Sequence, residues 1–333
     1  MGIISRLYIK KFVCRYDKAI GVPYYSYTDF KGLNQEEYSF TNSKGIELKY
    51  FYFYYDNYKK DNIVLFLHGL DCGHTAYMAE INELCKRGFK VLAIDYTGCG
   101  DSEGKCLDSL YQPTKDVIEL LDLLKLKKEI VLVGHSLGGF TSLNILSLRE
   151  EIKTAVILAG FISPKEELYR FIKSKFFVKG ILRYEKKISG NLYNLDNKEY
   201  LKSTKDRIFY IQSTDDQMVP YETTLKVVEE INNPSIKTLK MSGRKHNPNY
   251  TDSAIQYMNE VFGNFDKQLR EKQIKTKEDR INYFKDVSLD KLVEQDSILF
   301  DEIAEFISKK TSNLDNYDWG CLFVNLSVYF NIH

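Results

Sequence analysis

The sequence lacks an excess of charge of either sign, because 47 Lys and Arg stand against 46 Asp and Glu, a formal net charge of +1. Bulk electrostatic attraction to nucleic acid is therefore missing, and we expect no nucleic-acid partner. The six cysteines include no Cys-x-x-Cys pair, and the five histidines form no cluster at metal-ligand spacing. We expect no metal site, and we expect the cysteines to be reduced thiols in a cytoplasmic protein.

A sustained apolar run is also missing from the N-terminal region, residues 1–34. Charges that include Arg6, Lys10 and Lys11 interrupt its first helix-like stretch, so we expect neither a signal peptide nor a membrane-spanning helix. Gly2 does not begin a myristoylation motif, because the position that requires Ser or Thr holds Arg6. Two interpretations remain for this basic and apolar lead-in: packing on the body of the protein, or a weak contact with a membrane surface.

Short apolar segments rich in β-branched residues recur along the chain, with helix-like stretches between them. Such segments are typical of strands that are buried on both faces of a parallel sheet. The alternation predicts an α/β fold, and 333 residues are enough for one large core. A Tyr- and Phe-rich stretch at 36–56 predicts an antiparallel hairpin at the sheet edge. The other predicted strands are 63–67, 90–94, 130–133, 154–158, 207–211 and 236–241.

The segment 133–138, which reads VGHSLG, places Ser136 inside a Gly-x-Ser-x-Gly frame. It follows the predicted strand 130–133 and precedes a helix-like segment that starts at Phe140. In a nucleophile elbow, the serine stands on a sharp strand-to-helix turn, and the flanking glycines let neighbouring backbone pass without a Cβ clash. Ser136 is therefore the predicted nucleophile.

A serine nucleophile needs a base and an orienting carboxylate, which follow it in the order Ser, acid, His in this architecture. Only His246 and His333 lie after Ser136. We favour His246, because His333 is the last residue of the sequence, where chains are usually poorly ordered. Asp215 and Asp216 follow the predicted strand 207–211, at the edge where such sheets present their ligands. We choose Asp216 as the acid and keep Asp215 as the alternative.

Three motifs together resemble the α/β-hydrolase superfamily: LHGLDCGHTAY at 67–77, DYTGCGDSEG at 95–104 and the elbow at 133–138. Within that superfamily, the chain is most similar to the monoacylglycerol lipase, lysophospholipase and serine aminopeptidase-like group. The resemblance covers residues 35 to 265, and it extends to Asp216, which begins an Asp-x-x-Val-Pro sequence as in a variant found in the family.

The resemblance implies an oxyanion hole made of two backbone N–H groups, those of Leu70 and Leu137. His74 and Tyr77 match a recurrent His and Tyr in the same turn, whereas Cys99 replaces the histidine that is usual in the second motif. It further implies an α/β-hydrolase core, formed by residues 35–160 and 206–268, with a cap inserted between its two parts.

The cap is predicted at residues 161–205, since the connection between two predicted strands is much longer there than the crossover requires. Its apolar residues are expected to wall an acyl pocket and its basic ones to face anionic headgroups. The alternative is a plain amphipathic helix with a solvated charged face. The predicted pocket residues are His135, Phe171, Phe176, Phe177 and Ile181.

Residues 269–333 are predicted to be a C-terminal helical extension. Apolar residues recur at intervals of three and four between Leu289 and Ile307, as in an amphipathic helix. The end of the chain, from Trp319 to Phe330, is too apolar for a free tail, so we expect it to dock on the core or on a partner.

Together these features predict a serine hydrolase that cleaves a carboxylic ester, lipid-derived or small, through an acyl-enzyme intermediate. The expected partner is therefore a small-molecule ester or lipid substrate, and the chemistry needs no metal or organic cofactor. Two alternatives remain. A serine peptidase or amidase would use the same residues on an amide, and a non-catalytic protein would use the scaffold only to bind a ligand.

Overall fold

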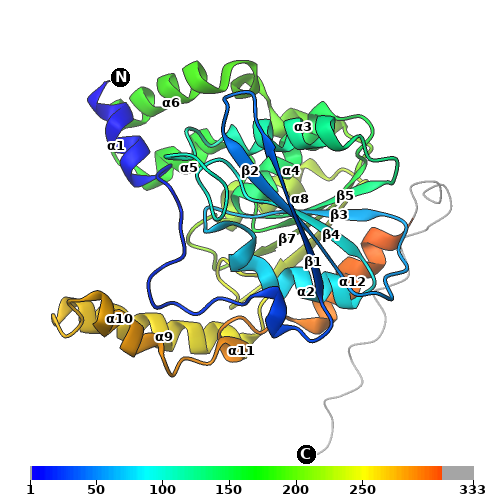
Figure 1. Cartoon of the computed structure of the whole chain (residues 1–333). Coiled ribbons are helices and arrows are strands. Elements are labelled where there is room, and N and C mark those ends of the chain that lie inside the picture. Colours follow the sequence, from blue (N-terminus) through cyan, green and yellow to red (C-terminus); the bar gives the residue numbers. More distant parts are fainter. Residues whose placement is uncertain (1, 310–333) are drawn as a thin grey trace, which may run out of the picture.

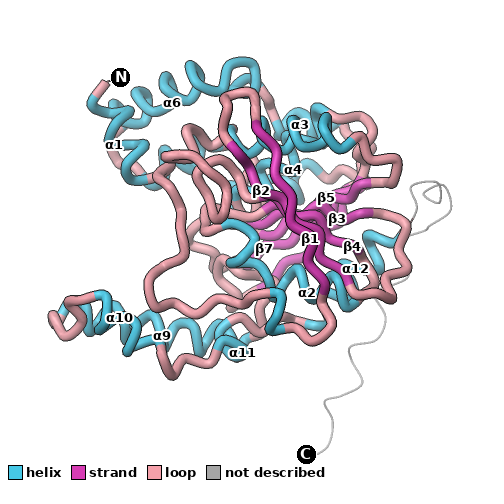
Figure 2. Tube along the Cα trace, viewed as in Figure 1, coloured by secondary structure: helices cyan, strands magenta, loops and turns pink. Residues whose placement is uncertain are grey.

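The computed structural model describes residues 2–309. Within this range the strands form one eight-stranded sheet in the order β1-β2-β4-β3-β5-β6-β7-β8, which crosses the centre of the molecule (Figures 1 and 2). Strands β3 to β8 are parallel, and the β1–β2 hairpin joins β4 in antiparallel orientation. This confirms the predicted parallel sheet with an edge hairpin. The strands are Asn34–Thr41 (β1), Glu47–Tyr54 (β2), Ile63–Leu67 (β3), Lys90–Ile94 (β4), Ile130–His135 (β5), Thr154–Leu158 (β6), Arg207–Ser213 (β7) and Ile236–Met241 (β8).

Helices cover both faces of the sheet, so its central strands are buried throughout. Alternate residues of a strand face opposite sides. Leu65 belongs to the apolar cluster that includes residues of α3, α4, α7 and α8, whereas Phe66 belongs to the cluster that includes residues of α2 and α12. The α/β-hydrolase architecture predicted from the sequence is therefore present. These helices are Met78–Lys86 (α2), Gln112–Leu124 (α3), Leu137–Leu148 (α4), Asn197–Ser203 (α7), Leu225–Ile231 (α8) and Ser297–Ser308 (α12).

The predicted cap segment, 161–205, forms α5 (Pro164–Phe171), α6 (Lys175–Ser189), a 3-10 turn at Gly190–Asn194, and α7. Arg170, near the end of α5, donates hydrogen bonds to the carbonyl oxygens of Gln217 and Met218. The cap is thereby tied to the loop that follows β7.

The N-terminal segment begins with helix α1 (Ile3–Lys11), which lies beside α6 (Figure 1). Tyr8 is buried at this contact, and its hydroxyl donates to Glu185 at 2.5 Å. Of the two interpretations of the lead-in, packing on the protein is the one that these contacts match, and its relation to a membrane stays a prediction.

The C-terminal segment differs from the single amphipathic helix expected between Leu289 and Ile307. The structure breaks it into α11 (Leu289–Leu292) and α12, because Asp296 accepts the N–H of Leu299 and so caps a new helix. Helices α9 (Asp252–Arg270), α10 (Lys277–Phe284) and α11 form an arm with its own small core (Figure 1). The predicted docking of 319–330 lies outside the described residues.

Helix α12 covers the same face of the sheet as α2, and it buries Leu299, Phe300, Ile303 and Ile307 there. Arg207 at the start of β7 donates to the carbonyl oxygens of Phe306 and Lys309, which fixes the end of the helix. No helix in residues 2–309 combines the length and apolar character needed to cross a bilayer.

Candidate active site

Ser136 stands in the tight turn between β5 and α4, with φ 54° and ψ −115°. A positive φ is strained for a residue with a side chain, and such strain is typical of functional sites. The turn needs its glycines, because a Cβ on Gly134 would lie 2.3 Å from the carbonyl oxygen of Gly138, and one on Gly138 would lie 1.8 Å from that of Leu67. Helix α4 begins directly after the serine, at Leu137, three residues before the predicted start at Phe140. Its positive dipole end is therefore at the serine.

His246 and Asp216 meet at the carboxyl end of the sheet. The Nδ1 atom of His246 lies 2.8 Å from Oδ2 of Asp216. Oδ1 of this buried carboxylate accepts the backbone N–H groups of Met218 at 2.8 Å and Val219 at 2.9 Å. The side-chain amide of Gln212 donates to Oδ2 at 2.7 Å. The carboxylate is thus held on both oxygens and accepts the imidazole N–H.

The alternative acid, Asp215, is directed elsewhere. It is exposed, and its Oδ1 accepts the hydroxyl of Ser213 at 2.5 Å. The structure therefore brings Asp216 rather than Asp215 to His246. The other histidine considered as a base, His333, lies outside the described residues.

His135, the residue before the serine, holds the backbone of His246. Its Nε2 lies 2.8 Å from the carbonyl oxygen of His246, and its Nδ1 lies 3.0 Å from the hydroxyl of Tyr77. Burial lowers the pKa of His135 to about 3, so the ring is neutral and carries a single N–H. Tyr77 accepts the N–H of Gly69 at 3.0 Å, so its hydroxyl proton goes to Nδ1 and the N–H of His135 is on Nε2.

This chain of hydrogen bonds ties the predicted oxyanion turn, the elbow and the loop of the base together. The rings of His135 and His246 are 4.8 Å apart, which places the imidazole of His246 beside the elbow. Among residues 2–309, no hydrogen bond joins Oγ of Ser136 to His246. In unliganded active sites this contact is often long and shortens when substrate binds.

The peptide group between Gly69 and Leu70 has a fixed orientation. The Nδ1–H of His68 donates to the carbonyl oxygen of Gly69 at 2.7 Å, and Nε2 accepts the N–H of Tyr96 at 3.2 Å. Residues 2–309 contain no cis peptide bond, so the N–H of Leu70 points away from His68. Neither this N–H nor that of Leu137, the first residue of α4, is used by a hydrogen bond within the described range. Both predicted oxyanion donors are therefore available.

His74 and Asp95 brace this turn from beneath. Asp95 accepts the backbone N–H groups of His74 at 2.6 Å and Asp101 at 2.9 Å, and the ring of His74 lies 3.0 Å from it. Burial alone would raise the pKa of Asp95, but the His74 ring and these hydrogen bonds hold it below its ordinary value. Ligand atoms of His74, Asp95 and Asp101 lie within 4.8 Å of one another, yet both Asp95 oxygens already accept N–H groups of the protein. The arrangement fits a structural brace.

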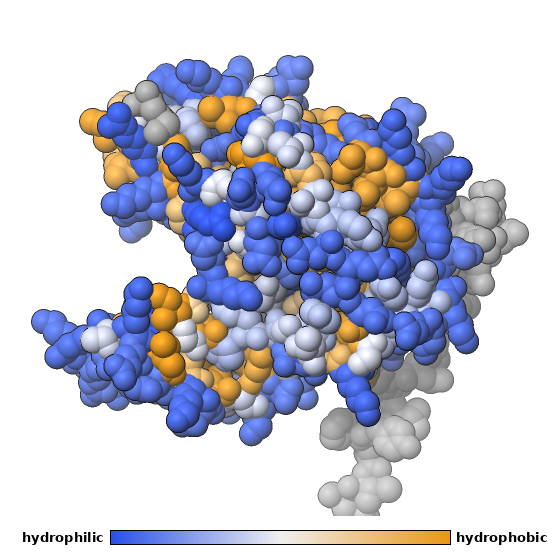
Figure 3. Space-filling model, viewed as in Figure 1, coloured by the Kyte–Doolittle hydropathy of each residue, from blue (hydrophilic) through white to orange (hydrophobic). Residues whose placement is uncertain are grey.

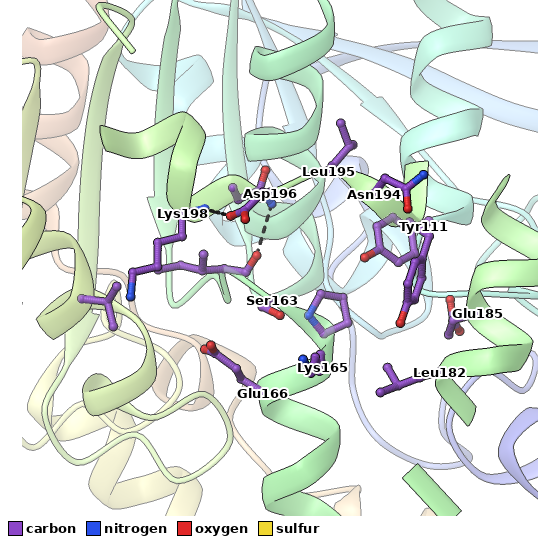
Figure 4. Close-up of a pocket in the computed structure, with 15 residues that line it drawn as sticks. Tyr111, Ser163, Lys165, Glu166, Leu182, Glu185, Asn194, Leu195, Asp196 and Lys198 are labelled. Carbon is purple, nitrogen blue, oxygen red and sulfur yellow. Dashed lines mark hydrogen bonds between the residues drawn. The ribbon is translucent and has the colours of Figure 1, made fainter. Parts of the chain in front are cut away.

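A cavity of about 430 Å³ lies between the cap and the core (Figure 4). Figure 4 shows Tyr111, Leu182 and Glu185 toward one end of this cavity and Asp196 and Lys198 toward the other. None of Ser136, Asp216 and His246 lines it. Tyr111 nevertheless packs edge-on against Phe140, one helical turn after the serine, with ring centroids 5.2 Å apart.

The predicted pocket residues lie elsewhere. Phe171, Phe176 and Phe177 are exposed on the cap, and Ile181 is buried in the packing of α6; none of them lines the cavity. Both nitrogens of His135 are used within the protein, which points to positioning rather than to contact with substrate. The part of all five in substrate binding stays a prediction.

Two residues of the site were not given a role from the sequence. Gln212 holds Asp216, and the signal for it was a polar residue directly after the apolar run 208–211 of β7. Tyr77 links the turn at Gly69 to His135, which lies 58 positions after Tyr77 in the sequence, a relation that no local pattern contains.

Comparisons with known proteins agree with this architecture. The model of a family described as "Serine aminopeptidase, S33" matches residues 58–240, more than half of the chain. AB hydrolase superfamily protein YisY of Bacillus subtilis is 33% identical over 91 residues, which are 26% of this chain and 32% of that protein. Human mitochondrial palmitoyl-protein thioesterase ABHD10 is 26% identical over 199 residues, 52% of this chain and 63% of that protein. The chain thus spans between about a third and less than two thirds of the length of these curated relatives.

Among solved structures, the Pyrococcus furiosus esterase Pf2001 aligns with a TM-score of 0.55 and 21% identity, covering 77% of this chain and 98% of that one. At this identity the likeness shows the shared fold. Together with the match to the family model, it shows that the chain belongs to the serine aminopeptidase S33 family of the α/β-hydrolase superfamily.

Proposed function

We propose that this protein is a serine hydrolase of carboxylic esters, lipid-derived or small, and that Ser136, His246 and Asp216 form its catalytic triad. The observation that carries the proposal is the 2.8 Å contact between Nδ1 of His246 and Oδ2 of Asp216, beside a strained elbow serine. This contact orients the imidazole so that Nε2 is free to act as the base.

The reaction we propose proceeds in two acyl-transfer steps. His246 takes the proton of Ser136 as the hydroxyl attacks the ester carbonyl, and it then gives that proton to the departing alcohol. Water, activated by the same imidazole, cleaves the acyl-enzyme and releases the acid. The N–H groups of Leu70 and Leu137 stabilise the oxyanion of each tetrahedral intermediate, with about 3 kcal/mol for each donor. No metal or organic cofactor takes part in these steps.

The cavity beneath the cap supports an acyl-binding role. Tyr111 lines it and packs against Phe140, four residues after Ser136, and Leu182 lies on its cap side. We therefore expect Leu182→Trp, which fills part of this space, to lower the rate on octanoate esters more than the rate on acetate esters. An equal fall in the hydrolysis rate on both esters would contradict this use of the cavity.

A fluorophosphonate probe tests the triad directly, since it labels only an activated serine. We expect labelling of the wild type and its loss in Ser136→Ala and His246→Ala, with exposed Ser203→Ala as the matched serine control. Full labelling of Ser136→Ala would refute the assignment. A folded wild type that the probe does not label would indicate a binding protein.

A p-nitrophenyl ester and a p-nitroanilide with the same acyl group distinguish an esterase from an amidase.

A further inference from the structure

Helices α1 and α6 pair side by side and in parallel, and they form one surface at the top of the molecule in Figure 1. Ile4 lies over Gly180, where an added Cβ would be 2.8 Å from its side chain. One turn later, Tyr8 donates to Glu185 at 2.5 Å and packs against Tyr184, with ring centroids 5.9 Å apart. We call residues 2–11 and 173–189 together the α1–α6 platform.

The platform is strongly basic although the whole chain is almost neutral, with a formal charge of +1. It holds nine Lys and Arg side chains and a single acid, Glu185, which is buried beneath Tyr8. All nine are exposed, and none forms a salt bridge within residues 2–309. The rest of the chain is therefore net negative. The nine are Arg6, Lys10, Lys11, Lys173, Lys175, Lys179, Arg183, Lys186 and Lys187.

Large apolar side chains lie exposed among these charges. Ile3 is 77% exposed and Phe176 is 73% exposed, and Leu7 and Phe177 are also exposed. Ile3 and Leu7 are four residues apart and so share one face of α1. Figure 3 shows apolar surface at the α1 corner, above the hollow that separates this part of the molecule from the α9–α10 arm. Exposed aromatic and aliphatic residues beside lysines are the composition of helices that lie at a lipid–water interface.

We propose that the α1–α6 platform binds the surface of an anionic lipid bilayer, with Ile3 and Phe176 inserted among the headgroups and the lysines and arginines on the lipid phosphates. Long basic side chains can bury their stems while the charges stay at the interface. A second copy of this chain is a poor occupant, because the same basic surface would face itself. A nucleic-acid backbone would satisfy the charges and leave the apolar side chains in water.

The platform adjoins the proposed active site. Helix α5, which leads into α6, ends one residue after Arg170, and Arg170 holds the carbonyl oxygens of Gln217 and Met218 next to Asp216. Phe171 and Met218 are exposed at this junction. A docked bilayer would therefore lie close to the loop of the acid. Binding to the bilayer does not depend on hydrolysis, so the test of this proposal is independent of the test of the proposed function.

Cosedimentation of the full-length protein with vesicles tests the proposal without any ester substrate. We expect binding to phosphatidylcholine vesicles that contain about 30% phosphatidylserine, and little binding to phosphatidylcholine alone. Raising the salt from about 0.1 M to about 0.5 M should release the protein, because the Debye length shortens. Equal binding to the two kinds of vesicle would overturn the proposal.

Two variants locate the contact. Arg6→Glu with Lys179→Glu and Arg183→Glu should weaken binding at least about tenfold, since each basic residue adds roughly a fivefold factor near an anionic surface. The matched control, Lys125→Glu with Lys127→Glu and Lys128→Glu, makes the same charge change before β5, at the opposite end of that strand from Ser136, and should bind as the wild type does. Equal loss in both triple variants would overturn the assignment to the platform.

Ile3→Ser with Phe176→Ser separates lipid from other anions. This variant keeps every charge and should lose vesicle binding at low salt, whereas binding to a DNA duplex would be unaffected by it. We expect this variant to unfold at the same temperature as the wild type, which would show that the two exposed substitutions leave the fold intact. A duplex that binds more tightly than the vesicles, or a salt-dependent dimer in sedimentation velocity that buries the platform, would overturn the lipid assignment.

Discussion

The Nε2 atom of His135 lies 2.8 Å from the backbone carbonyl oxygen of His246. The residue next to the proposed nucleophile thus holds the loop of the proposed base, although the two positions are 111 residues apart. Because Tyr77 joins the other ring nitrogen to Gly69, one neutral imidazole fixes the distance between three loops of the site.

Replacing this imidazole should cost activity through geometry. We expect His135→Phe to lower kcat on a p-nitrophenyl ester by about tenfold to a hundredfold with a smaller change in KM, since small displacements of reacting groups are that expensive. His135→Gln keeps a side-chain N–H that can reach the same carbonyl and should recover part of the loss. Wild-type kcat in His135→Phe would show that the bond does not position the base.

The two neighbouring aspartates offer a matched pair. Asp216→Asn keeps the shape of the acid and removes its charge, so we expect kcat to fall by up to about 10⁴-fold, as for triads in general. Asp215→Asn changes an exposed residue that is directed to Ser213 and should stay within a few-fold of the wild type. Steady-state kinetics on one ester checks both variants, and the reverse order of losses would transfer the acid to Asp215.

Stability should fall as the pH rises through weakly acidic values. Burial raises the pKa of Glu80, Glu167 and Glu185 from 4.5 to about 7, so the folded state keeps protons that the unfolded chain has already lost. A state that binds more protons is weakened when the pH rises, and the contribution of these three groups to the free energy of unfolding therefore decreases between about pH 4.5 and about pH 7.

Glu185→Gln removes one of these groups and should flatten that decrease, by on the order of 3 kcal/mol over the window. Urea unfolding at several pH values measures the effect, and exposed Glu278→Gln is the matched control. A slope in Glu185→Gln that equals the wild-type slope would mean that Glu185 is already ionised in the folded protein at acidic pH.

Helix α12 provides a second matched pair. Phe300 is fully buried against the sheet, and its replacement by Ala should lower the free energy of unfolding by about 3–5 kcal/mol. Ile298, two positions earlier, is 82% exposed, and Ile298→Ala should change stability by less than about 0.5 kcal/mol. Urea denaturation distinguishes the two, and a small effect at Phe300 would show that α12 adds little to the fold.

The parts of the fold that the sequence predicted well are local ones. The strands and the elbow are predicted by the spacing of residue types within short segments. Gly134 and Gly138 are required because the backbone of any such turn comes too close for a Cβ. The choice between Asp215 and Asp216 was less determined. It depends on how the backbone of Met218 and Val219 wraps one carboxylate, which adjacent letters do not reveal.

Long-range packing limited the other predictions. The break before α12 arises from the cap by Asp296, whereas the apolar period alone continues through it. Likewise, the apolar residues of the cap could not be sorted into inner and outer ones, since Ile181 is buried while Phe176, on the same helix, is exposed. Helix α6 packs against α1, which is more than 160 positions away in the sequence, so the sequence of the cap alone does not show which of its side chains are covered.

Because α12 covers one face of the sheet, its presence affects the solubility of truncated fragments of this protein. A fragment that stops at the end of the family match, residue 240, would lose His246 and would also lose the part of the cover over this face that α12 provides, including Phe306, which packs against Phe209. Such a fragment would expose an apolar face of the sheet and should be recovered in inclusion bodies. Domain boundaries drawn from sequence similarity alone would therefore yield insoluble protein.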